Sequence, residues 1–521
     1  MSIPQICLGN WFAARADRSP DRRALTFEGQ TLTYRQLLDR VDRLAAGFRK
    51  QGVRHGDRIG FIGSNQPAVL ETMLAAARLA AIFVPINFRL TGPELALIAN
   101  DAGLHTFVVD QANQAAVESV RDQLPVQSYV LLGGTVPGWT PYESLVDHES
   151  PLCTPEPVHA DEVAVIMYTS GTTGRPKGVM LTHANLWWNN TNLVDLFDVL
   201  ADDVTLVSSP LFHIAGLNVT IFTTWQKGGE VVLHRAFDAQ ATLDDIQRYR
   251  ISVLFGVPTM FQLISQLPSF GSADMSSVRT IICGGAPVPE ALIKRFHDQG
   301  ISMLNGYGLT ETAPHAAFLT AEHILAKPGS IGKPSLLSEI KIIDRDGVAV
   351  SEPFVAGEIC ARGPNVTKGY WNQPEATAEA IDTSGWFHTG DAGYLDADGF
   401  LYLVDRLKDI VVSGGENVSS VEVENVIRHH PVVTDVAIIG APHERWGETV
   451  VAVVVPQAGL TVTLEELRDF AGQSLARFKL PTQLILVDDL PRNPAGKVMK
   501  TQLRDRYRAI ATREVRAAAT S

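Results

Sequence analysis

The stretch YTSGTTGRPKGV, residues 168–179, combines hydroxyl side chains, three glycines and two cations with almost nothing apolar. Glycines let successive backbone N–H groups point at one spot, hydroxyl groups add donors, and a lysine adds a point charge. Such a stretch suits the binding of a phosphate group, although a hydroxyl-rich surface turn has the same composition. A Walker P-loop is excluded, because there Gly-Lys is followed directly by Ser or Thr, whereas Lys177 is followed by glycine and Lys497 by valine.

The composition is that of a globular protein, with 521 residues, 45% of them hydrophobic, and a formal net charge of −13. This length suggests about three domain-sized units. The acidic balance and the lack of a basic tract argue against a nucleic-acid partner. An anionic substrate would therefore need a local positive site.

The cysteines and the hydropathy pattern predict a soluble cytoplasmic protein. Cys7, Cys153, Cys283 and Cys360 are scattered without a CxxC spacing, which is typical of reduced thiols. The N-terminal residues contain no apolar signal core, and arginine and proline interrupt the longest apolar stretch, residues 73–86.

The elements expected to position the phosphate-binding stretch alternate between helices and strands. Residues 33–52 form one apolar helical stripe behind Thr33, a plausible N-cap. Buried strands and helices then alternate, which predicts parallel sheets covered by helices. The expected segments are 57–65, 67–80, 81–86, 104–110, 128–132, 205–212, 229–234 and 252–258.

The second half of the chain has a different pattern. From about Ile331, alternating strands with Asp-Gly turns predict antiparallel structure, either a small barrel or a distorted sheet, over about 331–405. After Asp405, helices at 420–431 and 463–475 alternate with strands in a compact α+β unit. The predicted α/β fold therefore has an N-terminal domain, residues 1–405, and a small C-terminal domain, residues 406–521.

Seven motifs, in order along nearly the whole chain, resemble those of the adenylate-forming superfamily. This superfamily includes acyl-CoA synthetases, peptide-synthetase adenylation domains and firefly luciferase. The sequence pattern of this chain is most similar to that of carboxylic acid:CoA ligases of the fatty-acyl and coumarate types. The motifs are YTSGTTGRPKGVMLTHANL (168–186), PLFHIAG (210–216), GGAPVP (284–289), NGYGLTE (305–311), GWFHTGD (385–391), DRLKDIVVSGGENV (405–418) and PRNPAGKVMK (491–500).

The resemblance implies a luciferase-like fold, with a mobile C-terminal lid, and a two-step reaction. A carboxylate first reacts with ATP to give an acyl-adenylate and pyrophosphate, and the acyl group then passes to coenzyme A. ATP, Mg²⁺ and coenzyme A are the implied cofactors and cosubstrates. Both reactants of the first step are anions, so positioning and charge neutralisation should supply most of the catalysis.

The resemblance also assigns roles to single residues. Lys497 would bridge the carboxylate and the α-phosphate, beside Thr310. Glu311 would bind Mg²⁺, although a Thr-Glu pair is also a common start of a helix. Lys408 would be the hinge of the lid. His213 would guard the acyl or thiol channel, although a histidine satisfied within the core is the alternative.

Further residues would bind the nucleotide and the thiol arm. Tyr307 would stack on adenine, and Asp391 and Arg406 would contact the ribose. The base would be lined by Gly284, Gly285, Ala286, Pro287, Asn305, Gly306 and Gly308; the phosphates by Thr169, Ser170, Gly171, Thr172, Thr173, Gly174 and Lys177; and the pantetheine tunnel by Ser413, Gly414 and Gly415. This chain departs from the family pattern at one point, since many relatives carry an aromatic residue and proline where it has Ser419 and Ser420.

The acid is expected to have a neutral, apolar tail. Residues 210–222, 253–261 and 307–318 should wall its pocket, and they contain neither lysine nor arginine. A second buried carboxylate would therefore lack a partner. Fatty, aryl and polycyclic acids all stay open, as does a homodimeric state. The other readings are an enzyme that loads a carrier protein, a luciferase-like oxygenase and a non-catalytic adenylate-binding scaffold.

Overall fold

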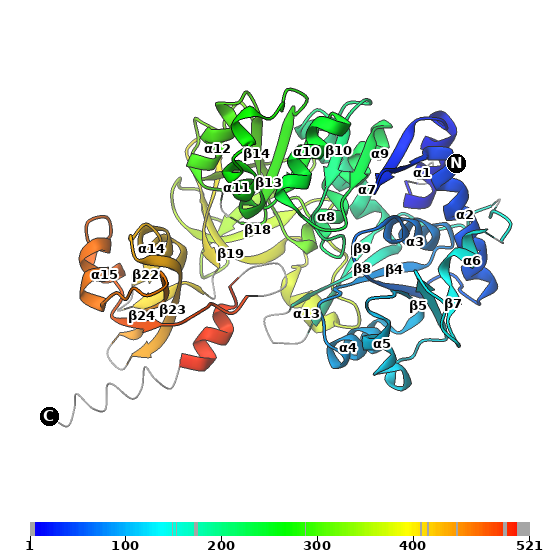
Figure 1. Cartoon of the computed structure of the whole chain (residues 1–521). Helices are drawn as coiled ribbons and strands as arrows, with labels where there is room; N and C mark the ends of the chain where they lie inside the picture. Colours follow the sequence, from blue (N-terminus) through cyan, green and yellow to red (C-terminus); the bar gives the residue numbers. More distant parts are fainter. Residues whose placement is uncertain are drawn as a thin grey trace. The chain divides into compact units, whose positions relative to one another are not determined.

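The computed structural model describes most of the chain, in two compact units (Figure 1). The described residues are 6–147, 149–152, 154–170, 176–286, 288–406, 409–413, 416–443, 446–492 and 498–507. The first unit comprises Met1–Ile340, Cys360–His388 and Gly399–Leu401, and the second comprises Lys341–Ile359, Thr389–Asp398 and Tyr402–Ser521.

A seven-stranded sheet in the first unit carries the phosphate-binding stretch at one edge. Its order is β7-β6-β5-β3-β4-β8-β9, and all neighbouring pairs are parallel except β8 and β9. Its inner strands are continuous apolar runs, as expected where helices cover both faces. The strands are β3 Arg58–Ile62, β4 Ile82–Ile86, β5 Leu104–Asp110, β6 Ser128–Leu132, β7 Thr140–Pro141, β8 Val163–Ser170 and β9 Pro176–Thr182. The connecting helices are α3 Pro67–Arg78, α4 Gly92–Ala102, α5 Gln114–Glu118 and α6 Tyr142–Asp147.

A second sheet contributes the strands on which two further motifs begin. Within the first unit, strands β1, β11, β10, β12, β13 and β14 run parallel in that order, while β2, β15 and β16 pair antiparallel at the ends. These strands are β1 Arg23–Phe27, β2 Gln30–Thr33, β10 Val204–Val207, β11 Glu230–Leu233, β12 Val253–Gly256, β13 Thr280–Gly284, β14 Ser302–Tyr307, β15 Ala317–Leu319 and β16 Ser330–Pro334.

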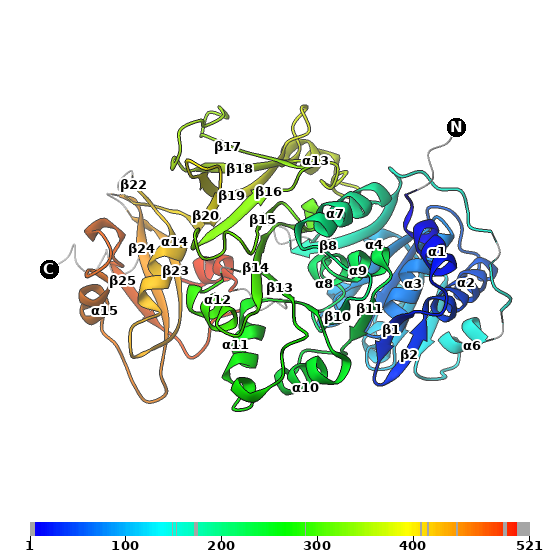
Figure 2. The same ribbon diagram turned by 90° about the horizontal axis from the view of Figure 1, so that it is seen from above.

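Helices pack against these sheets and bury the main core of the first unit (Figure 2). The largest fully buried side chains include Trp225, Tyr34 and Tyr142. The helices are α1 Leu8–Arg18, α2 Tyr34–Lys50, α7 His183–Leu196, α8 Ile214–Asn218, α9 Ile221–Lys227, α10 Ala239–Tyr249, α11 Pro258–Gln266, α12 Glu290–His297 and α13 Pro374–Ala380.

The helix expected behind Thr33 is confirmed as α2. The Thr33 hydroxyl accepts a hydrogen bond from the Gln36 N–H, and the Gln36 side chain accepts one from the Thr33 N–H, which forms a capping box. The apolar stripe of this helix is buried, with Leu37, Val41 and Leu44 fully inaccessible.

The second unit contains the α+β structure expected after Asp405. Its sheet has the order β22-β21-β24-β23, and β25 pairs in parallel with β24. The elements are β21 Val411–Ser413, β22 Glu416–Val418, α14 Ser420–Ile427, β23 Val433–His443, β24 Gly447–Pro456, α15 Leu464–Ala471 and β25 Gln483–Leu486.

The strands expected between residues 331 and 405 are also present. They are β16, β17 Glu339–Ile343, β18 Gly357–Arg362, β19 Phe387–Leu395 and β20 Leu401–Arg406. Compactness groups residues 341–359 and 389–398 with the second unit, whereas the sequence prediction counts them before its boundary at Asp405. Compactness does not locate a hinge, so the predicted boundary stays a prediction. None of the helices in the described ranges combines the length and the apolar character that crossing a membrane requires.

Candidate active site

The phosphate-binding stretch lies on an antiparallel pair of strands. Strand β8 ends at Ser170 and β9 begins at Pro176, and these two residues are paired in register. Thr169 pairs with Lys177, and its hydroxyl lies 3.5 Å from the Lys177 carbonyl oxygen. The predicted phosphate ligands Gly171, Thr172, Thr173 and Gly174 connect the two strands in sequence and lie outside the described residues. The described part therefore shows where the stretch begins and ends.

Tyr370 brings the predicted phosphate cation and the predicted metal ligand together. Its hydroxyl donates a hydrogen bond to Glu311 Oε1 at 2.9 Å, and the Lys177 ammonium lies 4.8 Å from the centre of its ring. Burial, and then the charge of Glu311, raise the pKa of Tyr370. The phenol therefore stays protonated and keeps donating to the carboxylate.

The backbone around Tyr370 is fixed to both partners. The next residue, Trp371, is bonded to β9, because its N–H donates to the Gly178 carbonyl at 2.7 Å. On the other side, the Thr367 N–H donates to the Glu311 carbonyl at 2.7 Å. Sequence reasoning missed Tyr370. Its signal was the adjacent aromatic pair Tyr370-Trp371, which directly follows Lys-Gly in a polar segment.

Thr310 and Glu311 lie in a single 3₁₀ turn, Thr310–Thr312. The turn is closed by Thr312, whose hydroxyl accepts the Leu309 N–H at 2.9 Å. The alternative interpretation, in which Thr310 and Glu311 cap an α-helix, therefore does not describe this segment. A carboxylate is a hard oxygen ligand of the kind Mg²⁺ prefers, so the donor chemistry of Glu311 fits that ion.

The two predicted adenine motifs begin on neighbouring parallel strands. Gly284 at the end of β13 pairs with Gly306 on β14, and a Cβ on Gly284 would lie 2.6 Å from the Gly306 carbonyl oxygen. Gly308 is similarly restricted, because a Cβ there would lie 1.7 Å from the Pro314 carbonyl oxygen. Backbone packing therefore requires glycine at both positions, whatever else these glycines do.

The other residues predicted around the base divide by environment. Asn305 is buried, and its side-chain amide donates to the Ser330 carbonyl at 2.9 Å, so it also ties β14 to β16. Tyr307 is half-buried at the end of β14, while Gly285 and Ala286 are exposed. Pro287 lies outside the described residues.

His213 is the N-cap residue of α8 and is only partly buried, within an aromatic group. Its ring lies 4.5 Å from the ring of Phe212, which meets Phe88 edge-on at 5.4 Å. The Arg89 guanidinium lies 5.2 Å from the Phe88 ring. The role of His213 as a channel guard stays a prediction.

The second unit contains the remaining predicted residues. Asp391 is buried, and its N–H donates to the Thr389 hydroxyl at 3.1 Å. Ser413 ends β21 and pairs with Glu416. The Arg406 backbone ends β20, but its side chain lies outside the described residues, as do all atoms of Lys408, Gly414, Gly415 and Lys497.

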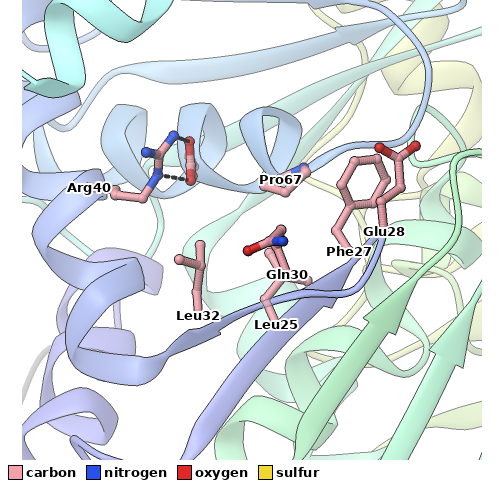
Figure 3. A pocket seen from close by; sticks show the side chains of 8 residues that line it. Leu25, Phe27, Glu28, Gln30, Leu32, Arg40 and Pro67 are labelled. Carbon is pink, nitrogen blue, oxygen red and sulfur yellow. Dashed lines mark hydrogen bonds and ion pairs between the residues drawn. The ribbon is translucent and has the colours of Figure 1, made fainter. Parts of the chain in front are cut away.

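Two cavities in the first unit lie next to the β1–β2 hairpin, and none of their lining residues is a predicted site residue. One of about 260 Å³ is walled by apolar side chains including Leu25, Leu32 and Pro67, with Arg40 reaching the Glu71 carboxylate beside it (Figure 3). The other, of about 320 Å³, is lined by His234, which lies 2.9 Å from Asp245. The motifs, and not these cavities, define the candidate site.

The fold and the motif residues define a nucleotide-dependent enzyme with a separate small C-terminal unit. A family model described as AMP-binding enzyme matches residues 12–371, and one described as AMP-binding enzyme C-terminal domain matches residues 422–497. The chain therefore belongs to the AMP-binding enzyme family.

Individual relatives cover almost the whole chain. It is 43% identical to a feruloyl-CoA synthase of Amycolatopsis sp, over 96% of this chain and 99% of the relative. It is 39% identical to an indoleacetate–CoA ligase of Aromatoleum aromaticum, over 95% and 97%. Among solved structures, the o-succinylbenzoate coenzyme A synthetase of Bacillus subtilis in complex with ATP and magnesium ion has a TM-score of 0.85 and 32% identity, over 95% and 99%. These matches confirm the adenylate-forming superfamily and its acyl-CoA ligase branch, so the protein is an acid–thiol ligase.

Proposed function

We propose that the protein is an ATP-dependent synthetase that joins an aryl carboxylic acid with a neutral, apolar body to coenzyme A through an acyl-adenylate. The observation that carries the proposal is the arrangement of Lys177 and Glu311 around Tyr370. In this arrangement, a cation from the phosphate-binding stretch and a carboxylate suited to Mg²⁺ contact the same side chain. Pyrophosphate formation from ATP requires both kinds of group close together.

In this proposal the protein acts mainly by positioning charges. Lys177 and the hydroxyl groups of residues 169–173 hold the phosphates, and Glu311 holds Mg²⁺, which neutralises phosphate charge when bound. Lys497 bridges the carboxylate and the α-phosphate, and Thr310 contacts the same phosphate. Tyr307 and the backbone of residues 284–286 hold adenine, and Asp391 and Arg406 hold the ribose. After pyrophosphate leaves, rotation of the C-terminal part at Lys408 admits the coenzyme A thiol beside residues 413–415.

The side chains within the three expected wall segments support a neutral acid, and a cation beside them, the Arg89 guanidinium, packs on the Phe88 and Phe212 rings. Residues 210–222 include the buried Leu211, Phe212 and Leu217. His315 lies within residues 307–318, and burial lowers its pKa to about 3, so it adds no positive charge at neutral pH. The names of the two relatives at 43% and 39% identity refer to aryl acids, which favours an aryl acid over a fatty or polycyclic one.

The test is a pyrophosphate-release screen over a panel of acids, with ATP and Mg²⁺, in the presence and absence of coenzyme A. Ferulate and indoleacetate represent aryl acids, a medium-chain fatty acid represents fatty acids, and o-succinylbenzoate represents dicarboxylates. We expect continuous turnover only with coenzyme A, and kcat/KM for the best aryl acid about tenfold or more above that for the dicarboxylate. Mass spectrometry should detect the acyl-CoA product.

Other outcomes would contradict the proposal. Pyrophosphate release that requires a phosphopantetheinylated carrier protein in place of coenzyme A would favour a carrier-loading enzyme. No release with any acid would favour a non-catalytic scaffold, and oxygen consumption would favour an oxygenase. A cytoplasmic location and a homodimeric state belong to the same proposal and are tested by cell fractionation and light scattering.

A further inference from the structure

Ser419 and Ser420, where many relatives carry an aromatic residue and proline, begin helix α14. Ser419 is the N-cap residue, whose hydroxyl accepts the Glu422 N–H at 3.2 Å and donates to the Val404 carbonyl at 2.8 Å. Ser420 adds a backbone N–H and a second hydroxyl group, neither of which proline has. Both groups of Ser420 are used in the structure.

The N–H and the hydroxyl of Ser420 both bind Asp405. They donate to Asp405 Oδ2 at 2.7 and 2.6 Å, and the Val421 N–H approaches the same oxygen at 3.3 Å. Both Asp405 and Ser420 are buried. A carboxylate at the start of a helix is stabilised by the unpaired N–H groups there. Asp405 is therefore held firmly to the start of α14.

Lys500 links Ser420 to a second carboxylate, that of Glu424. Its ammonium donates to the Ser420 hydroxyl and forms an ion pair with Glu424 Oε1 at 2.7 Å. The side chains of Lys500 and Glu424 are 12% and 11% exposed. Glu424 Oε1 also accepts the Ile438 N–H of β23 at 2.8 Å. We call these four residues, Asp405, Ser420, Glu424 and Lys500, the serine relay.

Lys500 follows the segment 493–497, which contains Lys497, by three positions. Arg492 and Val498 form an antiparallel bridge, and the Met499 N–H donates to the Pro491 carbonyl at 2.7 Å. Arg492 also forms an ion pair with Asp435. The described residues on both sides of 493–497 are therefore attached to the second unit, on the later side through the relay.

We propose that Ser420 and Lys500 are positioning residues for adenylate formation. The relay joins residue 500, three positions after Lys497, to residue 405, three positions before Lys408. It thereby anchors described residues that lie close in sequence to both lysines. The inference rests on the proposed function, because it assigns Lys497 to the first half-reaction only.

The test separates the two half-reactions in the full-length protein. Adenylate formation is measured by pyrophosphate–ATP exchange, and thioester formation by coenzyme A consumption from chemically prepared acyl-adenylate. We expect Lys500→Met to lower the exchange kcat about tenfold or more while thioester formation changes less than about threefold, because small displacements of a reacting group are costly. Ser420→Ala should have the same effect to a smaller degree, and Lys497→Ala marks the maximum loss.

Conservative and matched variants distinguish positioning from folding. Lys500→Arg and Ser420→Thr retain the charge and the hydroxyl, and should restore exchange to within about threefold of the wild type. Thr463→Ala removes the capping box of α15 in the same unit without touching the relay, so it should leave the ratio of the two half-reactions unchanged. If Lys500→Met does not fold, the comparison of Ser420→Ala with Ser420→Thr still shows whether the hydroxyl of residue 420 acts in positioning.

Three results would overturn the inference. The first is an equal loss of both half-reactions, which would make the relay purely structural. The second is normal exchange in both Lys500→Met and Ser420→Ala. The third, no exchange by the wild type with any acid, would instead remove the proposed function on which the inference rests.

Discussion

At the scale of single residues, the hydrogen bond from the Tyr370 hydroxyl helps to orient the Glu311 carboxylate. It donates to Oε1 at 2.9 Å and thereby restricts the rotation of the carboxylate group. Partners of this kind tune metal ligands by fixing their orientation. The ring of Tyr370 separately contacts Lys177, so the hydroxyl contact can be removed while the ring contact is kept.

Tyr370→Phe removes the hydroxyl and keeps the ring. We expect the Mg²⁺ concentration for half-maximal adenylate formation to rise about tenfold, because Glu311 loses its orienting partner. The kcat at saturating Mg²⁺ should fall by a smaller factor than this tenfold change, because Lys177 keeps its aromatic contact. Magnesium titrations of pyrophosphate–ATP exchange measure both. Tyr129→Phe removes another tyrosine hydroxyl from the same unit and is the control; an unchanged Mg²⁺ dependence in Tyr370→Phe would show that Glu311 needs no such partner.

Sequence reasoning found residue types at this scale but not their partners. Lys177 and Glu311 stand in short motifs, which made them visible. Tyr370 lies 59 positions from Glu311, and no local pattern connects the two. Asn305 is also visible as a motif residue, yet its bond to the Ser330 carbonyl depends on the placement of β14 and β16 on either side of β15. Partners of this kind follow from the tertiary structure alone.

At the scale of elements, helices α2 and α3 are joined by a buried ion pair. Arg40 on α2 contacts Glu71 on α3 at 2.6 and 3.2 Å, and Tyr142 donates to the same carboxylate at 2.7 Å. The Glu71 side chain is 1% exposed, whereas that of Arg40 is 27% exposed. Burial, followed by the neighbouring Glu71, raises the pKa of Tyr142, so its hydroxyl remains a donor. Glu71 is thus compensated from two sides.

Arg40→Met should destabilise the first unit by about 3 kcal/mol, because it leaves a buried carboxylate without its cation. The double variant Arg40→Met, Glu71→Met should recover at least half of that loss, since apolar residues can replace a buried pair at little cost. Chemical unfolding measures both free energies. Arg43→Met, which removes the exposed pair with Asp39 on the same helix and a hydrogen bond to the Glu149 carbonyl, should cost less than about 2 kcal/mol. Equal costs for Arg40→Met and Arg43→Met would contradict the assignment.

Elements were predictable where local signals agreed with the fold. The N-cap at Thr33, the apolar stripe of α2 and the apolar strand runs each specify local structure, and all are present. Residues 67–80 were expected to be helical, but nothing in that helix shows that Glu71 is buried. Burial of a charge depends on which helix lies opposite, and Arg40 and Tyr142 come from two other segments of the chain.

At the scale of the whole molecule, one chain must complete two reactions with different needs. The first brings two anions together, and the second admits a thiol. The resemblance assigns this change to rotation at Lys408, and the family matches, to residues 12–371 and 422–497, leave that residue in the stretch between them. A hinge needs a few backbone dihedrals that can change widely. The motif predicts the position of the hinge, and that position stays a prediction, because the rotation itself follows from no single arrangement of atoms.

Lys408→Pro tests the hinge directly, because proline fixes φ near −65°. We expect thioester formation from prepared acyl-adenylate to slow about tenfold or more, while pyrophosphate–ATP exchange changes less than about threefold. Lys408→Ala removes the side chain but keeps the dihedral freedom, and should leave the ratio of the two rates near that of the wild type. Lys408→Pro and Lys500→Met should therefore change the ratio of the two rates in opposite directions, because Lys500→Met should slow exchange and spare thioester formation. If both variants slowed the same half-reaction, hinge and relay would not serve separate steps, and the division of labour between Lys408 and Lys497 would be wrong.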